Sequence, residues 1–193
     1  KFICWDTLSL ERATVQHLFL YWTVFICMSS KKIFDMGHVD CTTESFLLML
    51  GKVRATIRPV HGEVKIVRRD EHPSHSKSNH KYQEYILGAG KTLDPSVLDQ
   101  NSVAGFHEGA AVPENAFGIL VPRANANLAQ SNKSTGFAYT ALKMAAIQRN
   151  KSLRIHSDSM VSPDMLYFGD SKPDLTSHPL YSYGSPCLYL VSA

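Results

Sequence analysis

The chain has 193 residues, and its hydrophobic content of 44% fits one large or two small globular domains with a real core. A net charge of +3 from 20 basic and 17 acidic residues is mild and dispersed, so we expect no nucleic-acid partner. The most apolar run, residues 18–28, is too short to cross a bilayer, and we expect no membrane partner either.

Strands dominate the prediction for the N-terminal half. Residues 1–16 show no clear apolar period and predict an irregular arm with some helix. Residues 18–28 are rich in aromatic and β-branched side chains, which predicts a strand buried on both faces. A second short strand is expected to begin at residues 33–34. Residues 44–58 are predicted to continue as strand, and residues 63–69 alternate apolar and polar side chains as a half-buried strand does.

Turns and short strands also dominate the prediction for the C-terminal half. Residues 70–84 are charged and rich in histidine, which predicts an exposed loop, and FGILV at residues 117–121 predicts a clear strand. One helix is predicted at residues 135–149, where Ala, Leu, Lys and Met favour helix. Two further short strands are expected at residues 85–87 and 152–156. Many short strands with little helix predict an all-β barrel or sandwich.

A candidate nucleophile, Ser171, lies on a predicted tight turn after an apolar run. Gly169 lets the backbone fold where a Cβ would clash, so two backbone N–H groups can lie beside the serine hydroxyl. That is the geometry which acyl transfer needs. Gly, Asp and Ser are also common turn formers, so an ordinary surface turn is the alternative.

Several landmarks occur in an order that is typical of one enzyme family. They are a cysteine on an apolar strand, a Gly-His pair followed by a cysteine, a later acid, a Gly-Asp-Ser turn and the strand after it: Cys27, Gly37-His38, Cys41, Glu84, Gly169-Asp170-Ser171 and residues 182–187. In this order the chain resembles the chymotrypsin/trypsin-like serine peptidases. The resemblance implies two antiparallel six-stranded β-barrels with little helix. The N-terminal barrel, with its arm, would span residues 1–98 and the C-terminal barrel residues 99–193.

The resemblance also implies a role for each candidate site residue. Ser171 would attack a carbonyl, His38 would take its proton, and Glu84 would orient the imidazole. The N–H groups of Gly169 and Ser171 would stabilise the oxyanion. The substrate-binding residues would be Met165 at the base of the specificity pocket and Ser182, Tyr183 and Gly184 on the strand that follows.

Partners and location follow from the same resemblance. A disulfide between Cys27 and Cys41 would clip the loop of His38 to its strand, which implies a secreted or extracellular protein. Cys187 would then pair with Cys4 or stay free. A peptide or protein is the expected substrate or ligand, and no cofactor or metal is expected.

Departures from the family pattern weigh against catalysis. Lys172-Pro173-Asp174 stands where the family has two glycines and a proline behind the nucleophile, and proline fixes φ and removes a donor. Tyr85 aligns best with the catalytic aspartate, which leaves Glu84 on the other face of a strand. We therefore predict a catalytically impaired homologue that binds peptide or protein, with an active serine endopeptidase as the open alternative.

Other families and plainer roles stay open. FGDSKPD at residues 168–174 also fits the GDSL esterases, and residues 113–130 are similar to a motif of the dUTPases. Residues 138–160, with Asp158, resemble part of an RNase H but lack its helix glutamate. A non-enzymatic β-rich binding protein is a further alternative. A transition metal could be chelated by three histidines of the predicted loop, namely His72, His75 and His80.

Overall fold

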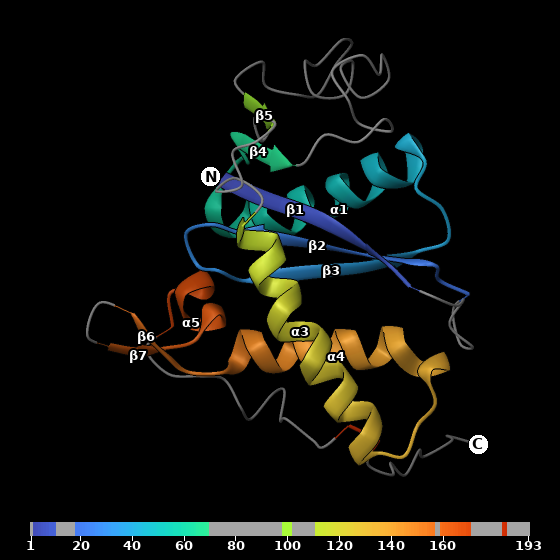
Figure 1. Cartoon of the computed structure of the whole chain (residues 1–193). Coiled ribbons are helices and arrows are strands. Elements are labelled where there is room, and N and C mark those ends of the chain that lie inside the picture. Colours follow the sequence, from blue (N-terminus) through green and yellow to red (C-terminus); the bar gives the residue numbers. More distant parts are fainter. Residues whose placement is uncertain are drawn as a thin grey trace, which may run out of the picture.

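The computed structural model describes residues 2–10, 18–69, 98–101, 111–156, 159–170 and 183–184. Their centre is a five-stranded mixed sheet in the order β3-β2-β1-β4-β5 (Figure 1). Its strands are β1 (Phe2–Ser9), β2 (Tyr21–Cys27), β3 (Ile33–His38), β4 (Ile66–Arg69) and β5 (Leu98–Asn101). The strands β1, β2 and β3 pair antiparallel, whereas β4 runs parallel to β1 and β5 parallel to β4.

Helices cover both faces of this sheet, as Figure 1 shows. One face packs against α1 (Thr43–His61), and the other packs against α3 (Ala111–Gln130) and α4 (Ala138–Lys151). The rest of the described chain consists of short elements: the 3-10 turn η2 (Thr135–Phe137), the hairpin of β6 (Arg154–His156) and β7 (Ser159–Val161), and α5 (Pro163–Phe168). The fold is therefore α/β, with a sheet between two helical layers.

The alternation of side chains along β1 divides the core into two halves. Ile3 and Trp5 belong to the apolar cluster beneath α1, whereas Cys4 belongs to the cluster beneath α3 and α4. The central strand β2 supplies both clusters, with Phe25 on the α1 side and Val24 on the other. Because both faces of β2 are covered, its sequence is almost continuously apolar.

The helix α1 forms because its sequence has a helical cap and a helical period. The Thr42 hydroxyl accepts a hydrogen bond from the Ser45 N–H at 3.3 Å and so caps the first turn. Its buried residues recur at helical spacing and pack on β1 and β2: Phe46, Met49, Leu50, Val53 and Ile57. This stripe places the whole helix across one face of the sheet.

The prediction of an all-β fold with two six-stranded barrels is wrong. The structure has long helices where strands were expected, because residues 44–58 lie within α1 and residues 117–121 lie within α3. Residues 1–16 were predicted as an irregular arm, but they contain β1, a strand in the middle of the sheet. Strands at residues 18–28 and 63–69 are confirmed by β2 and β4.

The predicted helix at residues 135–149 is confirmed by η2 and α4, and the strand at residues 152–156 by β6. The short strand predicted at residues 85–87 lies outside the described residues.

None of the described helices is long and apolar enough to span a membrane.

The disulfide implied between Cys27 and Cys41 is also wrong, since both are free thiols and Cys4 is free as well. Cys27 instead lies 3.2 Å from the Ser29 hydroxyl, and the Cys4 thiol lies 3.3 Å from the sulfur of Met28. These cysteines behave as small apolar side chains at one end of the sheet.

Candidate functional site

His38, the predicted catalytic base, ends β3 and is only 8% exposed. Its Nε2 atom lies 2.8 Å from the Thr23 hydroxyl, and its Nδ1 atom lies 2.5 Å from the Asp40 carbonyl oxygen. A carbonyl can only accept, so Nδ1 carries the proton and Nε2 accepts from Thr23. Burial lowers the pKa of His38, which favours this neutral tautomer. Both ring nitrogens are thus engaged by the protein's own groups.

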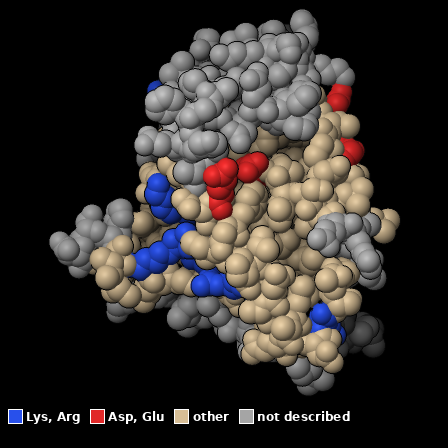
Figure 2. Space-filling model, viewed as in Figure 1, with Lys and Arg blue, Asp and Glu red and all other residues tan. Residues whose placement is uncertain are grey.

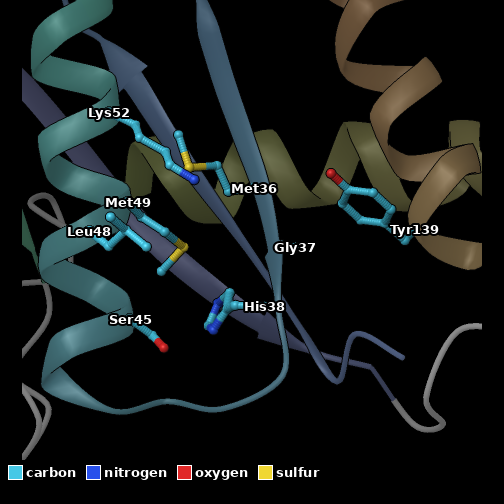
Figure 3. A pocket seen from close by; sticks show the side chains of 8 residues that line it. All are labelled: Met36, Gly37, His38, Ser45, Leu48, Met49, Lys52 and Tyr139. Atoms are coloured by element: carbon cyan, nitrogen blue, oxygen red, sulfur yellow. The ribbon is translucent and has the colours of Figure 1, made fainter. Parts of the chain in front are cut away.

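The surroundings of His38 form a small pocket between β3 and α1 (Figure 3). Its volume is about 250 Å³, and α1 contributes Ser45, Leu48, Met49 and Lys52 to its wall. The wall mixes apolar and polar side chains, and both imidazole nitrogens already have partners, Thr23 and Asp40. In the described part of the chain, His38 is thus held by Thr23 and the backbone of Asp40.

The burial of His38 predicts a pH-dependent stability. The pKa of His38 lies below its ordinary value of 6.5 in the folded chain, so the unfolded chain takes up this proton first as the pH falls. The stability contributed by the neutral ring is present above about pH 6.5 and is lost as the pH drops towards the folded pKa. We expect His38→Gln to flatten the fall in unfolding free energy between about pH 7.5 and about pH 5.5, measured by urea titration.

The same titration of His61→Gln, a histidine of α1 away from this pocket, is the control for general histidine effects. The change of slope should be seen in the His38 variant. Equal slopes for wild type and His38→Gln would contradict the prediction.

The other predicted site residues are spread over separate places in the described chain. Gly169 ends α5 in a left-handed conformation, with φ of 77°, and Met165 is buried within that helix. The Tyr183 hydroxyl lies 2.6 Å from the Thr140 hydroxyl at the start of α4, and Gly184 is the next residue in a turn. The remaining predicted residues lie outside the described part of the chain, so the triad stays an untested prediction: Glu84, Ser171 and Ser182.

Asp6 is the carboxylate that the fold places most centrally. It lies on β1, the middle strand of the sheet. Neighbouring residues of a strand point to opposite faces, and Trp5 faces α1, so Asp6 faces α3 and α4. The side chain is half-buried, and its Oδ1 atom accepts a hydrogen bond from the Thr7 N–H at 2.7 Å. A carboxylate inside a sheet loses hydration and is retained only where charge or hydrogen bonds compensate it. Asp6 is therefore the strongest candidate for a functional residue.

A chain of hydroxyl groups fixes the strand that carries Asp6. On the opposite face of the sheet, the Thr7 and Thr23 hydroxyls lie 2.7 Å apart, and Thr23 bonds His38. These hydrogen bonds link β1, β2 and β3 through their side chains, in addition to the backbone pairing of the three strands. His38 thus helps to hold the frame around Asp6, which is a positioning role.

A second carboxylate comes from the first turn of α3, which packs against β1. Figure 2 shows red side chains gathered where the start of α3 lies over β1. The only acidic residue of β1 is Asp6, and the only acidic residue of α3 is Glu114. Asp70 directly follows β4, the parallel neighbour of β1, in the sequence, but it lies outside the described residues.

These carboxylates are suited to one kind of metal site. The described residues contain no cluster of three His, Cys, Asp or Glu side chains that could hold a metal ion. Magnesium is usually held by one or two carboxylates together with waters and phosphate oxygens of a substrate. Asp6 and Glu114 therefore supply the type of donor that magnesium prefers, and the described residues form no closed all-protein site.

Sequence reasoning missed Asp6 because residues 1–16 were predicted to be an irregular arm. The available indication was an acid that directly follows the apolar run Phe2–Trp5, in a segment whose alternate residues Ile3, Trp5 and Thr7 share one face. Burial of an ionisable side chain in such a strand costs free energy unless a partner compensates its charge, so such a residue is a candidate for a functional role.

No family model and no curated protein sequence matches the chain. Among solved structures, it is similar to the catalytic core domain of BIV integrase, with a TM-score of 0.60 and 15% identity over 87% of this chain and 93% of that one. It is also similar to the HTLV-2 integrase catalytic core domain in complex with magnesium, with a TM-score of 0.59 and 11% identity over 86% of this chain and 95% of that one.

A third similar structure is a chain in the simian T-cell lymphotropic virus intasome in complex with PP2A regulatory subunit B56 gamma. Here the TM-score is 0.65 and the identity 12%, and the whole of this chain spans 60% of the length of that one. These likenesses show an RNase H-like fold of the kind found in retroviral integrase cores. They overturn the resemblance to serine peptidases, the peptidase-like function with its peptide ligand, and the expected absence of a nucleic-acid partner.

Proposed function

We propose that the chain is a nucleic-acid-binding domain of integrase type in which Asp6 helps to hold a divalent cation against a phosphate of the bound strand. The observation that carries the proposal is the position of Asp6, half-buried on the central strand of an RNase H-like sheet and beneath α3. A similar integrase core was solved in complex with magnesium, which supports the choice of ion.

Electrostatics supports the need for a cation at this place. Asp6 and Glu114 bring negative charge to the region where β1 meets α3, and a nucleic-acid backbone would be repelled by them. A bound magnesium ion would neutralise the carboxylates and bridge them to a phosphate oxygen. The described residues bring no three such side chains together, so the proposal is one of binding.

The test is the affinity for a labelled DNA duplex, measured by fluorescence anisotropy in magnesium and in EDTA at matched ionic strength. We expect magnesium to tighten binding by about tenfold, which corresponds to about 1.4 kcal/mol. Asp6→Asn should remove this magnesium effect, because the amide keeps the size of the side chain but loses its charge.

The control is Asp170→Asn, which removes an exposed acid just after α5 and should leave the magnesium effect intact. Asp70→Asn is a useful further variant, chosen from its sequence position after β4. An equal magnesium effect in wild type and Asp6→Asn, or no binding of DNA in either buffer, would refute the proposal.

A further inference from the structure

Three arginines from separate elements gather on one face of the molecule. Arg123 lies on α3, Arg149 lies on the last turn of α4, and Arg154 begins β6. All three are half-buried. Figure 2 shows blue side chains in a band over the region where α3, the end of α4 and β6 meet. The fold therefore brings together three positively charged side chains that come from separate elements of the chain.

The packing of α3 against α4 sets this arrangement. The side-chain amides of Asn127 and Gln148 face each other across the two helices, with contacts of 3.4 and 3.5 Å. Arg123 lies one turn before Asn127, and Arg149 follows Gln148, so the crossing brings both arginines to the same edge. A terminal nitrogen of Arg154 donates to the Arg149 carbonyl oxygen at 3.2 Å, which fixes the third member.

Within the described part of the chain, no ion pair supplies a counter-charge to this cluster. The Nε atom of Arg149 is buried and has no hydrogen-bond partner, and none of the ion pairs found among the described residues involves these three arginines. Burial, and then the charges of Arg154 and Arg123, lower the pKa of Arg149 to about 10. Burial and the charge of Arg123 also lower the pKa of Arg154. Folding therefore works against the mutual repulsion of three cations.

We propose that Arg123, Arg149 and Arg154 form a binding site for one phosphate group of a nucleic-acid backbone, separate from the carboxylates at β1. A phosphate has several acceptor oxygens, and guanidinium groups bind such oxygens through pairs of N–H donors. An anion placed among the three would satisfy the buried Arg149 donor and cancel the repulsion. The band lies on the same face as the carboxylates in Figure 2, so one extended strand can reach both.

The test uses the full chain in EDTA, so that its outcome does not depend on the magnesium effect proposed for Asp6. The affinity for a DNA duplex is measured over a range of salt concentrations for wild type and Arg149→Gln. We expect Arg149→Gln to weaken binding by about tenfold at low salt and to reduce the slope of log affinity against log salt by about one. Both effects should be the same for duplexes of different sequence, because phosphate contacts carry no sequence information.

A second readout separates a phosphate site from a merely structural role. Because the three charges repel one another, Arg149→Gln should raise the melting temperature of the free protein while it weakens DNA binding. Inorganic phosphate should raise the melting temperature of wild type more than that of Arg149→Gln at matched ionic strength. Lys133→Gln, at the turn between α3 and α4, is the matched control and should change neither readout by as much.

Three outcomes would overturn the site. One is an unchanged salt slope in both Arg149→Gln and the Arg123→Gln, Arg154→Gln double variant. Another is a lower melting temperature for Arg149→Gln with unchanged DNA affinity, which would show that the arginine is structural. The third is arginine-dependent binding of polyglutamate without arginine-dependent binding of DNA, which would point to an acidic protein as the partner.

Discussion

Replacement of Trp22 by alanine is expected to lower the free energy of unfolding by about 3–5 kcal/mol. Trp22 lies on the central strand β2 and is fully buried, with 0% of its surface exposed. Its ring packs in the cluster beneath α3, 5.8 Å from the ring of Phe117. Alanine would leave a large cavity between the sheet and α3, and the helix that carries Glu114 and Arg123 would lose its support.

A second variant separates the volume of the ring from its hydrogen bond. The Trp22 Nε1 atom donates to the Asp35 carboxylate at 3.1 Å, and burial raises the pKa of Asp35. Trp22→Phe keeps most of the ring but removes this donor, so we expect a smaller loss of about 1–3 kcal/mol. Urea unfolding followed by circular dichroism measures both variants. A loss below about 1 kcal/mol for Trp22→Ala would contradict the packing of α3 on the sheet.

The strands and the helix that were predicted correctly are segments whose local sequence pattern already favours the structure that they adopt in the fold. In β2 both faces are buried, so the run at residues 21–27 is almost entirely apolar, with Thr23 as the hydroxyl-bearing exception. In α4 the sequence favours helix through Ala, Leu, Lys and Met. In such segments the intrinsic preference and the tertiary environment agree, and the sequence alone is sufficient.

The helices that were missed show patterns with two interpretations. Residues 44–58 of α1 include β-branched residues such as Val53 and Ile57, which are also common in strands, although the burial period is helical. In α3, Pro113 and Pro122 suggested turns on either side of a short strand. Pro122 instead lies inside the helix, which is held to the sheet by buried residues four apart: Ala116, Leu120, Ala124 and Leu128. Tertiary packing therefore outweighs the cost of an internal proline.

The candidate sites could not be predicted because they depend on pairings between distant segments. The parallel pairing of β1 with β4 aligns Phe2 with Ile66, and nothing in either segment alone indicates it. The positive charge was judged too dispersed for nucleic acid because Arg123 and Arg149 are far apart in sequence. The crossing of α3 and α4 brings them together, so net charge and spacing hid a surface that only the fold creates.

Replacement of Asn150 by alanine is expected to cost about 2–4 kcal/mol, because it leaves two backbone groups without partners. Asn150 is buried at the end of α4, and its side-chain amide bonds both polar groups of Ile33 on β3. The Ile33 N–H donates to Oδ1 at 2.8 Å, and Nδ2 donates to the Ile33 carbonyl at 2.7 Å. Because β3 is at the edge of the sheet as described, none of its strands can replace these bonds.

The same substitution should also weaken DNA binding, because Asn150 fixes the end of the helix from which Arg149 projects. Asn150→Asp is the matched test of direction: its carboxylate can accept from the Ile33 N–H but cannot donate to the carbonyl, so it should be at least as destabilising as alanine. Asn125→Ala removes an exposed asparagine of α3 and should change the unfolding free energy by less than about 0.5 kcal/mol. If Asn150→Ala were as neutral as Asn125→Ala in urea unfolding, the amide would not join α4 to the sheet edge, and the placement of Arg149 would need another cause.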